Sequence, residues 1–387
     1  MKNCSSSMIV VMALLMTLSC SSGEKQTSEN VLDFSLFKVK HLALSHFSEY
    51  GKIKKVIKLE TNDKSVFGSI DRLRIDNKTG DILIGDFDTR KQVLRFNKDG
   101  NFLTSYGKVG EGPSEHHSLL DFCTNENGEV VLLTDSKLIK YSMTGSPLLE
   151  TKINVFGEDI ETFQDKIFVS ILGYDNKPKE KKALQVYNSF LVNIGGIGEY
   201  EERFEIYRFG VLRKMAVNHD RLYFIEHYDF ELNVYDLNSQ KISQLRIPNN
   251  NSVLDKVWEK RHFVEADRTE IKSRLHRFDD IYSLKNELLL HESWKEKKVY
   301  NIWRLNLDKK EAVIYSMFSF YKDWEIKNPS QLFFSYFVGT YENAVIAVFL
   351  DSDDFNKYKG DYPALKTIDF KLDDNPILAF YEFNEAL

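Results

Sequence analysis

The chain has 387 residues, of which 42% are hydrophobic and 13% aromatic, and its formal net charge is −6. This length suits two average domains or one large domain built from repeats. The mild acidity leaves no basic patch or stripe of the kind that nucleic-acid-binding proteins carry, so we expect no nucleic-acid partner. The 28 Phe and 19 Tyr residues favour strands over helices.

Residues 1–19 have the pattern of a signal peptide. Lys2 supplies a short positive region, and residues 8–18 (MIVVMALLMTL) form an uncharged apolar run that is too short to span a bilayer. Residues 20–30 have no apolar periodicity and are expected to form a flexible tether. The folded domain is expected to occupy residues 31–387.

Cys20 stands where the apolar run gives way to a Ser/Gly stretch. Residues 17–20 (TLSC) resemble a bacterial lipobox, with Thr17 in the place of the usual Leu. The resemblance implies cleavage before Cys20 and lipidation of its thiol, which would anchor the protein in the cell envelope at the outer membrane, on its periplasmic or surface face. A soluble secreted protein that is cut nearby is the alternative.

The cysteine count argues against a disulfide framework. Cys4 leaves with the signal peptide, Cys20 would carry the lipid, and Cys123 stands alone in an apolar run. Stability must therefore come from the hydrophobic core, and Cys123 is expected to be a buried structural residue.

A unit of four short strands begins at Ile70. Its apolar runs are separated by turns rich in Asn, Asp and Gly, which supply local hydrogen bonds or positive φ. The runs are Ile70–Ile75, Asp81–Ile84, Val93–Phe96 and Phe102–Tyr106. Four strands with hairpin signals predict one antiparallel sheet of the kind that forms a propeller blade.

The second strand of this unit recurs along the chain. Each copy follows a polar turn, and the copies begin at Asp81, Glu129, Lys166, Arg221, Glu287 and Ala344. Spacings of this order are typical of propeller blades, although irregular ones. The sequence therefore predicts an all-β fold, a six-bladed β-propeller with four-stranded antiparallel blades.

Three further segments complete this prediction. Residues 249–277 are highly charged with apolar positions at helical spacing, which predicts a small helical insertion between blades four and five. Ile377–Phe383 is the last strand and Ile53–Leu59 is left unused at the other end, so pairing the two would close the ring. Val31–Tyr50 is expected to cover one end of the domain.

The glycine-rich run at residues 106–116 (YGKVGEGPSEH) carries a family resemblance. It resembles the run IGxxGxGPGEY of a family of six-bladed β-propeller lipoproteins of Bacteroides-type bacteria, with Ser114 in place of Gly and His116 in place of Tyr. Residues 57–61 (IKLET) and 373–376 (DDNP) also match this family, which is similar in fold to NHL-repeat propellers. The resemblance implies fold and location but no substrate, because activities have not been assigned to most members.

The same run could be mistaken for a phosphate-binding loop. A P-loop needs Gly-Lys-Ser/Thr opening a helix, whereas here Pro113 follows and no helical pattern begins. We expect a tight joint between blades, with positive φ at Gly107, Gly110 and Gly112. A matching GxxGE run suggests the same turn role for Gly195 and Gly198.

Candidate ligand-binding residues follow the second strands at equivalent places, and one more lies on the first joint between blades. They are Asp86, Asp88, Arg90, His116, Asp135, His227 and His291. Aspartates at such places could form a polar ring on one face, or could serve only to make turns through side-chain hydrogen bonds.

A metal site formed by His116, His117 and Asp121 is disfavoured because adjacent residues of a strand point to opposite sides. The sequence has no CxxC or HExxH spacing and no nucleophile elbow. We therefore predict no metal, no cofactor and no catalytic residue.

These features predict a lipid-anchored binding or scaffolding module in the cell envelope. Its partners would be the membrane, through the N-terminal lipid, and an envelope protein, a peptide or a glycan, since propeller loops are rigidly held platforms. The alternative is a metal-dependent hydrolase or lyase of the lactonase-like propeller type, with three or four ligands converging in the central channel. A purely structural member of an envelope complex would expose a large apolar patch.

Overall fold

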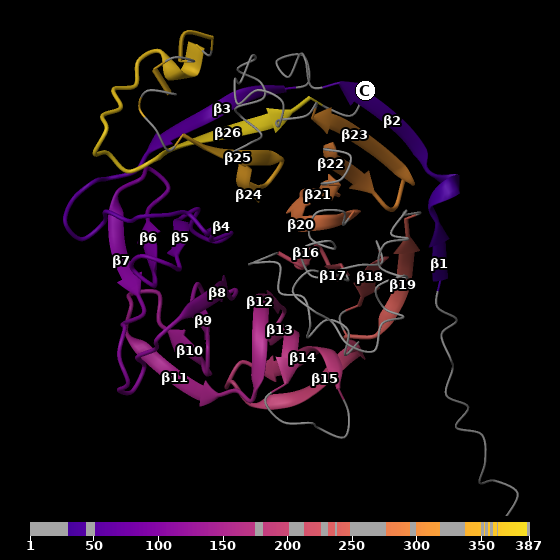
Figure 1. Ribbon diagram of the computed structural model, residues 1–387, viewed down its shortest axis with the longest axis horizontal. Helices are drawn as coiled ribbons and strands as arrows, with labels where there is room; N and C mark the ends of the chain where they lie inside the picture. The colour runs from indigo at the N-terminus through magenta and orange to yellow at the C-terminus, as the bar shows by residue number, and fades with distance from the viewer. Residues whose placement is uncertain are drawn as a thin grey trace, which may run out of the picture.

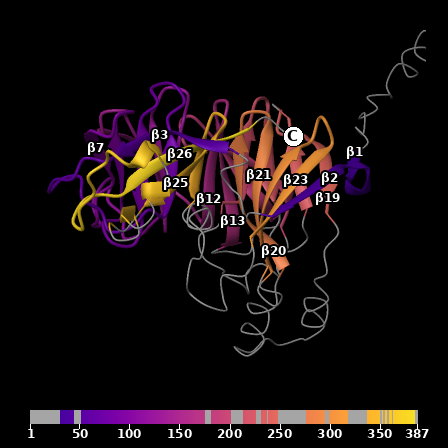
Figure 2. The same cartoon turned by 90° about the horizontal axis from the view of Figure 1, so that it is seen from above.

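The strands form six separate sheets that stand around a central axis, which confirms the predicted six-bladed β-propeller (Figure 1). The computed structural model describes residues 30–43, 51–174, 181–200, 213–225, 231–236, 238–247, 276–294, 299–317, 337–349, 352, 355–356, 359–361 and 363–384. Seen from the side, the strands run across the thickness of the ring (Figure 2).

Blades 1 to 3 each use four consecutive strands, paired antiparallel from the axis outward. Blade 1 has β4 (Arg72–Ile75), β5 (Ile82–Asp86), β6 (Gln92–Phe96) and β7 (Phe102–Tyr106). Blade 2 has β8 (Leu119–Thr124), β9 (Val130–Thr134), β10 (Lys137–Tyr141) and β11 (Pro147–Lys152). Blade 3 has β12 (Val155–Phe163), β13 (Lys166–Tyr174), β14 (Lys182–Asn188) and β15 (Asn193–Glu199).

Blades 4 to 6 combine consecutive strands with segments from the start of the chain. Blade 4 has β16 (Met215–Asn218), β17 (Arg221–Ile225), β18 (Glu231–Tyr235), β19 (Lys241–Arg246) and β1 (Asn30–Asp33). Blade 5 has β20 (His276–Leu284), β21 (Glu287–Trp294), β22 (Val299–Asn306), β23 (Glu311–Met317) and β2 (Lys38–Ala43). Blade 6 has β24 (Phe337–Tyr341), β25 (Ala344–Phe349), β26 (Ile377–Phe383) and β3 (Gly51–Lys58). Short 3-10 helices are η1 (Phe34–Leu36), η4 (Lys359–Asp361) and η5 (Pro363–Leu365).

The hairpin turns follow the chemistry that the sequence predicts. In blade 1 the Asp76 carboxylate accepts a hydrogen bond from the Lys78 amide at 2.9 Å, and Gly80 has a φ of +75°. The turn between β6 and β7 repeats this arrangement, because the Asn97 side chain accepts from the amide of Asp99 at 3.0 Å and Gly100 has a φ of +91°. Such side-chain bonds hold the backbone in the reversal without help from the rest of the fold.

The core lies between the blades, where the faces of neighbouring sheets pack together. Successive residues of β5 point to opposite faces of the sheet. Ile82 and Ile84 accordingly pack in one cluster with Ile346 of blade 6, whereas Leu83 packs with Leu132 of blade 2. Burial of each such side chain is worth about 1.5–3 kcal/mol, so the second strands, buried on both faces, hold the ring together.

The ring closes where β3 pairs with the last strand, β26, as predicted. Strand β3 pairs antiparallel with β26, with Ile57 opposite Leu378. Asn375 fastens the same junction, since its side-chain amide donates to the backbone oxygens of Glu60 at 2.6 Å and Ser65 at 2.9 Å. The two terminal motifs that match the family, residues 57–61 and 373–376, therefore lie against each other.

The first strands form a belt around half of the ring. Strand β1 pairs parallel with β19 of blade 4, β2 pairs parallel with β23 of blade 5, and β3 belongs to blade 6 (Figure 1). We call β1, β2 and β3 the N-terminal belt. The expectation that Val31–Tyr50 covers one end of the domain was wrong for residues 30–43, because free backbone groups at the outer edges of blades 4 and 5 take up these residues as extra strands.

Several predicted segments lie outside the described residues. They are the signal peptide, the tether with Cys20, and the helical insertion at 249–277, of which only His276 and Arg277 are described, as the start of β20. In the part of the chain that the structure describes, no helix is long and apolar enough to cross a membrane.

Candidate functional site

A ring of charged side chains occupies equivalent positions on or just before the innermost strands of five blades. Each member lies opposite the same place in the second strand of its blade, so that Asp121 is paired with Leu133 as Asp159 is with Ser170. We call this set the inner charged ring; from blade 1 to blade 5 it consists of Arg72, Asp121, Asp159, Lys214 and Asp280.

β-Bulges set the direction of the three aspartates. The register of the innermost strand shifts between Leu119 and Asp121, between Gly157 and Asp159, and between Phe278 and Asp280. A bulge inserts one extra residue and re-aims the side chains that follow it. The same irregularity in three blades therefore delivers a carboxylate to the same level of the ring.

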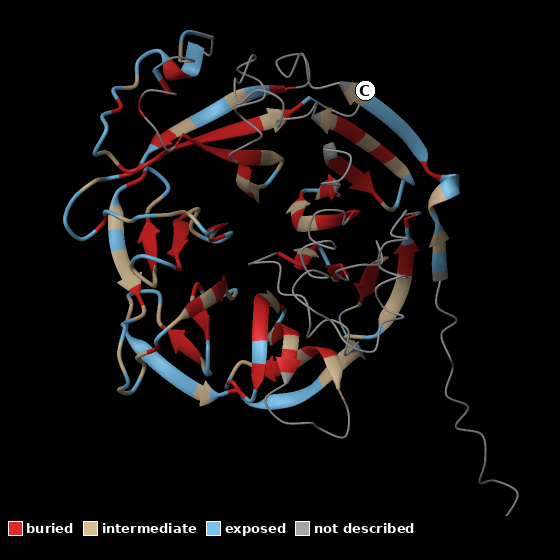
Figure 3. Ribbon diagram, in the orientation of Figure 1, coloured by how far each residue is buried: buried red, intermediate tan, exposed pale blue. Residues whose placement is uncertain are grey.

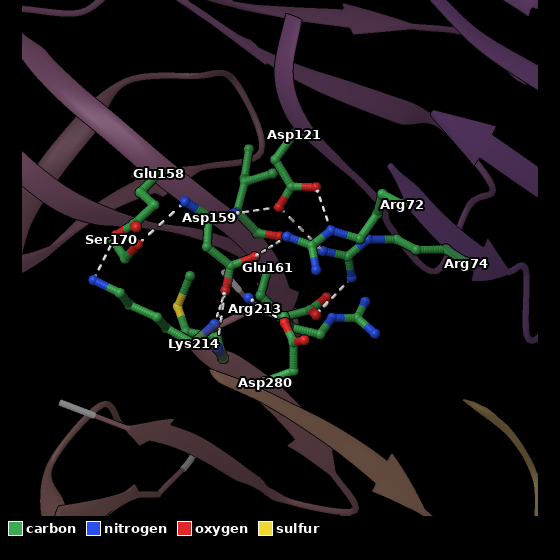
Figure 4. A network of polar contacts seen from close by, with 12 residues as sticks. Arg72, Arg74, Asp121, Glu158, Asp159, Glu161, Ser170, Arg213, Lys214 and Asp280 are labelled. Carbon is green, nitrogen blue, oxygen red and sulfur yellow. Dashed lines mark hydrogen bonds and ion pairs between the residues drawn. The ribbon is translucent and has the colours of Figure 1, made fainter. Parts of the chain in front are cut away.

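Asp121 is the centre of the network in Figure 4. Its carboxylate is fully buried and accepts from Arg72 Nε at 3.0 Å and from the amide of Ile160 at 3.0 Å, while Arg74 Nη2 lies 3.6 Å away. Burial opposes the ionisation of Asp121, but the charges of Arg72 and Arg74 outweigh it and lower its pKa to about 2. Blades 1, 2 and 3 are joined at this carboxylate.

Asp159 is a neighbour of Asp121 in the network, and its pKa is shifted in the opposite direction. One carboxylate oxygen accepts from the amides of Lys214 at 2.9 Å and Met215 at 2.8 Å, which connects blade 3 to blade 4. Burial and then the charge of Asp121 raise the pKa of Asp159 well above its ordinary value. Two neighbouring carboxyl groups with pKa values pushed apart favour one ionised and one protonated member, here Asp121 and Asp159 respectively.

Further ion pairs extend the network away from the ring. Arg74 Nη1 lies 2.6 Å from Glu161 Oε2, and Lys214 Nζ lies 2.5 Å from Glu158 Oε2. The side chains of Lys214 and Glu158 are each only 5% exposed. Breaking a buried pair by removing one partner typically costs about 3–5 kcal/mol, so these contacts fix blades 1 and 4 relative to blade 3.

Arg213 directly precedes Lys214, and its surroundings differ from those of Arg72, Arg74 and Lys214, which are each paired with a carboxylate. Its amide donates to Asp280 Oδ1 at 2.8 Å, its carbonyl accepts from the amide of Ile281 at 3.0 Å, and its guanidinium lies 5.0 Å from the ring centroid of Tyr282. Among the described residues, no carboxylate forms an ion pair with it. Burial and then the charges of Arg74 and Arg72 lower the pKa of Arg213 to about 10.

His291 is the predicted candidate that lies at the inner charged ring. Its Nδ1 is 3.9 Å from Asp280 Oδ2, and its ring packs against Tyr282 and Phe337 with centroid distances of 5.6 and 4.7 Å. Burial lowers the pKa of His291, which favours the neutral imidazole.

Asp86 and Arg90 make turn contacts at the end of β5. The buried Asp86 carboxylate accepts from the amides of Gly68 at 2.8 Å and Thr89 at 2.9 Å. Arg90 donates to the carbonyl of Lys64 at 2.6 Å. Asp88 and Asp135 are exposed, and His227 lies outside the described residues. The structure therefore does not bring this predicted set together, and a ligand role for its members stays a prediction.

His116 lies in the joint between blades 1 and 2. It is 2% exposed, and its Nε2 is 2.9 Å from the carbonyl oxygen of Lys91. Burial lowers its pKa. Its ring lies beneath Gly107, where an added Cβ would be 2.8 Å from His116 Cε1. These contacts give His116 a packing role in the joint.

The glycine predictions are partly right. Gly107 (φ +95°) and Gly110 (φ +154°) have the expected positive φ, but the prediction for Gly112 was wrong, because Ser114 (φ +57°) takes the left-handed position instead. Gly195 and Gly198 have positive φ of +129° and +74°, yet they lie within β15 and not in a turn. The GxxGE run thus follows the fourth strand in blade 1 and forms it in blade 3.

Sequence reasoning missed the inner charged ring, apart from Asp121. A signal does exist, because a charged residue stands shortly before the polar turn that introduces the second strand in five of the units. The pairing itself is invisible in the sequence, since Arg72 and Asp121 belong to different blades.

The outermost strands are largely exposed or half-buried all around the ring (Figure 3), but the side chains that they expose differ between the two halves of the molecule. We call β7, β11 and β15 the uncovered rim, because the N-terminal belt does not reach blades 1 to 3. The uncovered rim exposes large apolar side chains, namely Leu103 (50% exposed), Leu148 (46%), Leu149 (37%) and Ile194 (52%). The belt also exposes Val31 and Val39, but β2 and β3 carry lysines at six positions, Lys38, Lys40, Lys52, Lys54, Lys55 and Lys58.

Residues 31–382 match a family model described as a domain of unknown function, DUF4934. The chain belongs to the DUF4934 family. This match spans all six blades and the N-terminal belt. No curated protein matches the chain.

Solved structures of low sequence identity resemble the chain to different degrees. A Bacteroides fragilis protein classed as exported is 16% identical, with a TM-score of 0.67 over 92% of this chain and 100% of its own. BamB from Moraxella catarrhalis is 9% identical (TM-score 0.41, 86% of this chain and 100% of its own), and a Bacteroides caccae protein of unknown function is 12% identical (TM-score 0.35, 59% and 70%). At 16% identity the similarity to the B. fragilis protein shows the fold alone, and nothing is inferred from the two weaker similarities.

Proposed function

We propose that this protein is an exported, lipid-anchored binding module of the cell envelope that holds an extended polypeptide segment of a partner along its uncovered rim. The observation that carries this proposal is the contrast between the two halves of the ring. The outer strands of blades 1 to 3 are edges with exposed leucine and isoleucine, whereas the outer strands β2 and β3 are rich in lysine.

The chain's own architecture supports strand addition at such an edge. In blades 4 and 5 the outermost hairpin strand already accepts a further strand, β1 or β2, in parallel orientation. Proteins protect free edges with lysine, proline or bulges, because an unprotected edge invites pairing with another chain. An extended peptide that adds to an edge gains affinity from main-chain hydrogen bonds and specificity from alternate side chains.

The chemistry of the rim indicates what the partner segment would present. Phe190, Val192 and Ile194 alternate along the chain into β15 and are 73%, 55% and 52% exposed. Gly195 follows, and an added Cβ there would meet nothing within 4 Å. A strand with apolar side chains at alternate positions fits this surface, since it would cover the apolar groups and satisfy the free backbone groups together.

A metal-dependent hydrolase or lyase fits the inner charged ring less well. Three aspartates do gather there, as such an enzyme would require. However, Asp121 is bound by Arg72 and the amide of Ile160, and Asp159 accepts from the amides of Lys214 and Met215. A metal ion would have to displace these donors and leave the buried guanidinium of Arg72 without its counter-charge. We therefore favour binding over catalysis.

The location in the envelope rests on the N-terminal sequence. The lipobox resemblance at Cys20 supports a lipid anchor, and the lipoprotein family with NHL-like propellers that the glycine-rich run resembles supports the same location. The similarity in fold to a B. fragilis protein classed as exported is compatible with it.

Photocrosslinking in intact cells tests the rim. A photoreactive amino acid at Leu149 or Ile194 should crosslink one partner, which mass spectrometry identifies, and the same residue at Lys54 of β3 should not. The purified partner should then bind the wild-type chain, and Leu149→Lys with Ile194→Lys should weaken that binding at least tenfold. Equal crosslinking from Lys54, or unchanged affinity of the double variant, would refute the proposal.

A further inference from the structure

The polar network in and around the inner charged ring contains buried polar atoms that form no hydrogen bond within the described chain. Three of them are guanidinium nitrogens on three different side chains, Arg72 Nη2, Arg74 Nε and Arg213 Nε. A buried donor without a partner costs about 1–3 kcal/mol, and native proteins contain few of them. Arg72 Nη2 lies 3.6 Å from Asp159 Oδ1, a buried acceptor that also lacks a hydrogen bond, so Arg74 Nε and Arg213 Nε are the two donors that call for an acceptor from outside the chain.

Arg213 is the strongest of these donors. Its side chain is about nine-tenths buried, at 7% exposure, and its cationic neighbours each have a carboxylate that it lacks. Arg72 is paired with Asp121 and Arg74 with Glu161, at 3.0 and 2.6 Å. A buried guanidinium without a counter-charge is unfavourable unless an anion joins it.

The position of Arg213 is fixed before any ligand arrives. Hydrogen bonds from its amide to Asp280 and from the amide of Ile281 to its carbonyl hold its backbone against blade 5. The stacking on Tyr282 at 5.0 Å holds its guanidinium. A preorganised donor loses little freedom when it binds, which favours affinity.

The three arginines lie close enough to act together. Arg72 and Arg74 both approach the carboxylate of Asp121, at 3.0 and 3.6 Å, and their positive charges contribute to the lowered pKa of Arg213. Figure 4 shows them within one network, drawn from blade 1 and from the segment that precedes β16. Two carboxylates of this network are already engaged, since Glu161 binds Arg74 at 2.6 Å and Asp280 accepts from the amide of Arg213 at 2.8 Å.

We propose that Arg213, with Arg72 and Arg74, forms a binding site for a small oxyanion, a carboxylate or phosphate group, inside the inner charged ring. Guanidinium groups match both of these anions in geometry and charge. The unsatisfied guanidinium atoms are all donors, so the ligand must bring acceptors. This site is separate from the uncovered rim and does not depend on a partner strand there.

Calorimetric titration of the full-length protein with inorganic phosphate and with succinate tests the site. Sodium chloride at matched ionic strength serves as the control for general screening. We expect saturable binding of at least one of the two anions to the wild type, at one site per chain, and at least tenfold weaker binding to Arg213→Met. Arg221→Met is the matched control, because Arg221 lies outside the inner charged ring and pairs with Asp308 at 2.9 Å. This variant should bind the anion as the wild type does.

The outcomes that overturn the proposal are distinct from those that concern the rim. Absence of saturable binding of both anions to the wild type would refute it, whatever the variants do. If circular dichroism shows that Arg213→Met does not fold, Arg213→Lys keeps the charge but loses Nε, and an unchanged affinity for that variant would also refute it. Leu149→Lys and Ile194→Lys should bind the anion normally, so failure of either proposal leaves the other standing.

Discussion

Replacement of Asp121 by Asn removes the charge at the centre of the network while it keeps the size of the side chain. Arg72 at 3.0 Å and Arg74 at 3.6 Å then lose their shared counter-charge, although both remain buried. Removal of one partner of a buried pair typically costs about 3–5 kcal/mol. We expect Asp121→Asn to lower the free energy of unfolding by about 3 kcal/mol at pH 7.

The pKa of Asp121 gives an independent estimate of this effect. A fall from its ordinary value near 4 to about 2 corresponds to roughly 2–3 kcal/mol, at 1.36 kcal/mol per pKa unit. Because the pKa is lower in the folded state, this stabilisation is complete above the pKa of the unfolded chain and disappears as the pH falls through about 2. The difference between wild type and Asp121→Asn should therefore shrink between pH 5 and pH 2.

Urea unfolding followed by tyrosine and tryptophan fluorescence at a series of pH values measures this difference. Asp88→Asn is the matched control, since Asp88 is exposed on the turn after β5, and it should stay within about 0.5 kcal/mol of the wild type. A loss below 1 kcal/mol for Asp121→Asn at pH 7, or a loss that does not change with pH, would refute the role that we give to this carboxylate.

Three further predictions concern closure, the joint between blades and the anchor. Ile57→Ala in β3 should cost about 2–5 kcal/mol in urea unfolding, because Ile57 is 3% exposed in the closing strand, whereas the exposed Lys55→Ala should cost little; equal effects would argue against closure as a source of stability. Gly107→Ala should lower the melting temperature by a few degrees, at roughly 1–2 °C per kcal/mol for a domain of this size, because the added Cβ would lie 2.8 Å from His116 Cε1 at a φ of +95°. A melting temperature equal to that of the wild type would show that the joint can adapt to the added methyl group. Cys20→Ala should move the protein from the membrane to the soluble fraction, and membrane association that persists in this variant would contradict lipidation.

The sequence predicts the features of this fold that depend on local chemistry. Asn97 and Gly100 form a turn through a local hydrogen bond and a positive φ, so the hairpins and the second strands could be found from turn residues and apolar runs alone. The closing pair of β3 and β26 could be predicted because each of these strands lacked a partner in the sequence pattern. The parallel pairing of β1 and β2 could not be predicted, since any free edge of the ring could have accepted them.

The candidate site was less accessible to sequence reasoning. His291 was singled out, but its surroundings at Asp280 and Tyr282 depend on a bulge in β20 that leaves no mark in the sequence. Arg213 has no conspicuous motif around it, and only its missing counter-charge, which is a property of the folded chain, distinguishes it from other arginines.

The N-terminal belt has a consequence for the order in which the chain can fold. Its three strands are synthesised first, yet their pairing partners β19, β23 and β26 are among the later strands of the chain. Contacts between such distant segments form late, after much chain entropy has been lost. Blades 1 to 3 can assemble as they emerge from the ribosome, whereas the belt must wait and is fastened last, when β26 becomes available to β3. Loss of β26 would therefore leave β3 without its partner and open the ring, while β1 and β2 keep their partners β19 and β23.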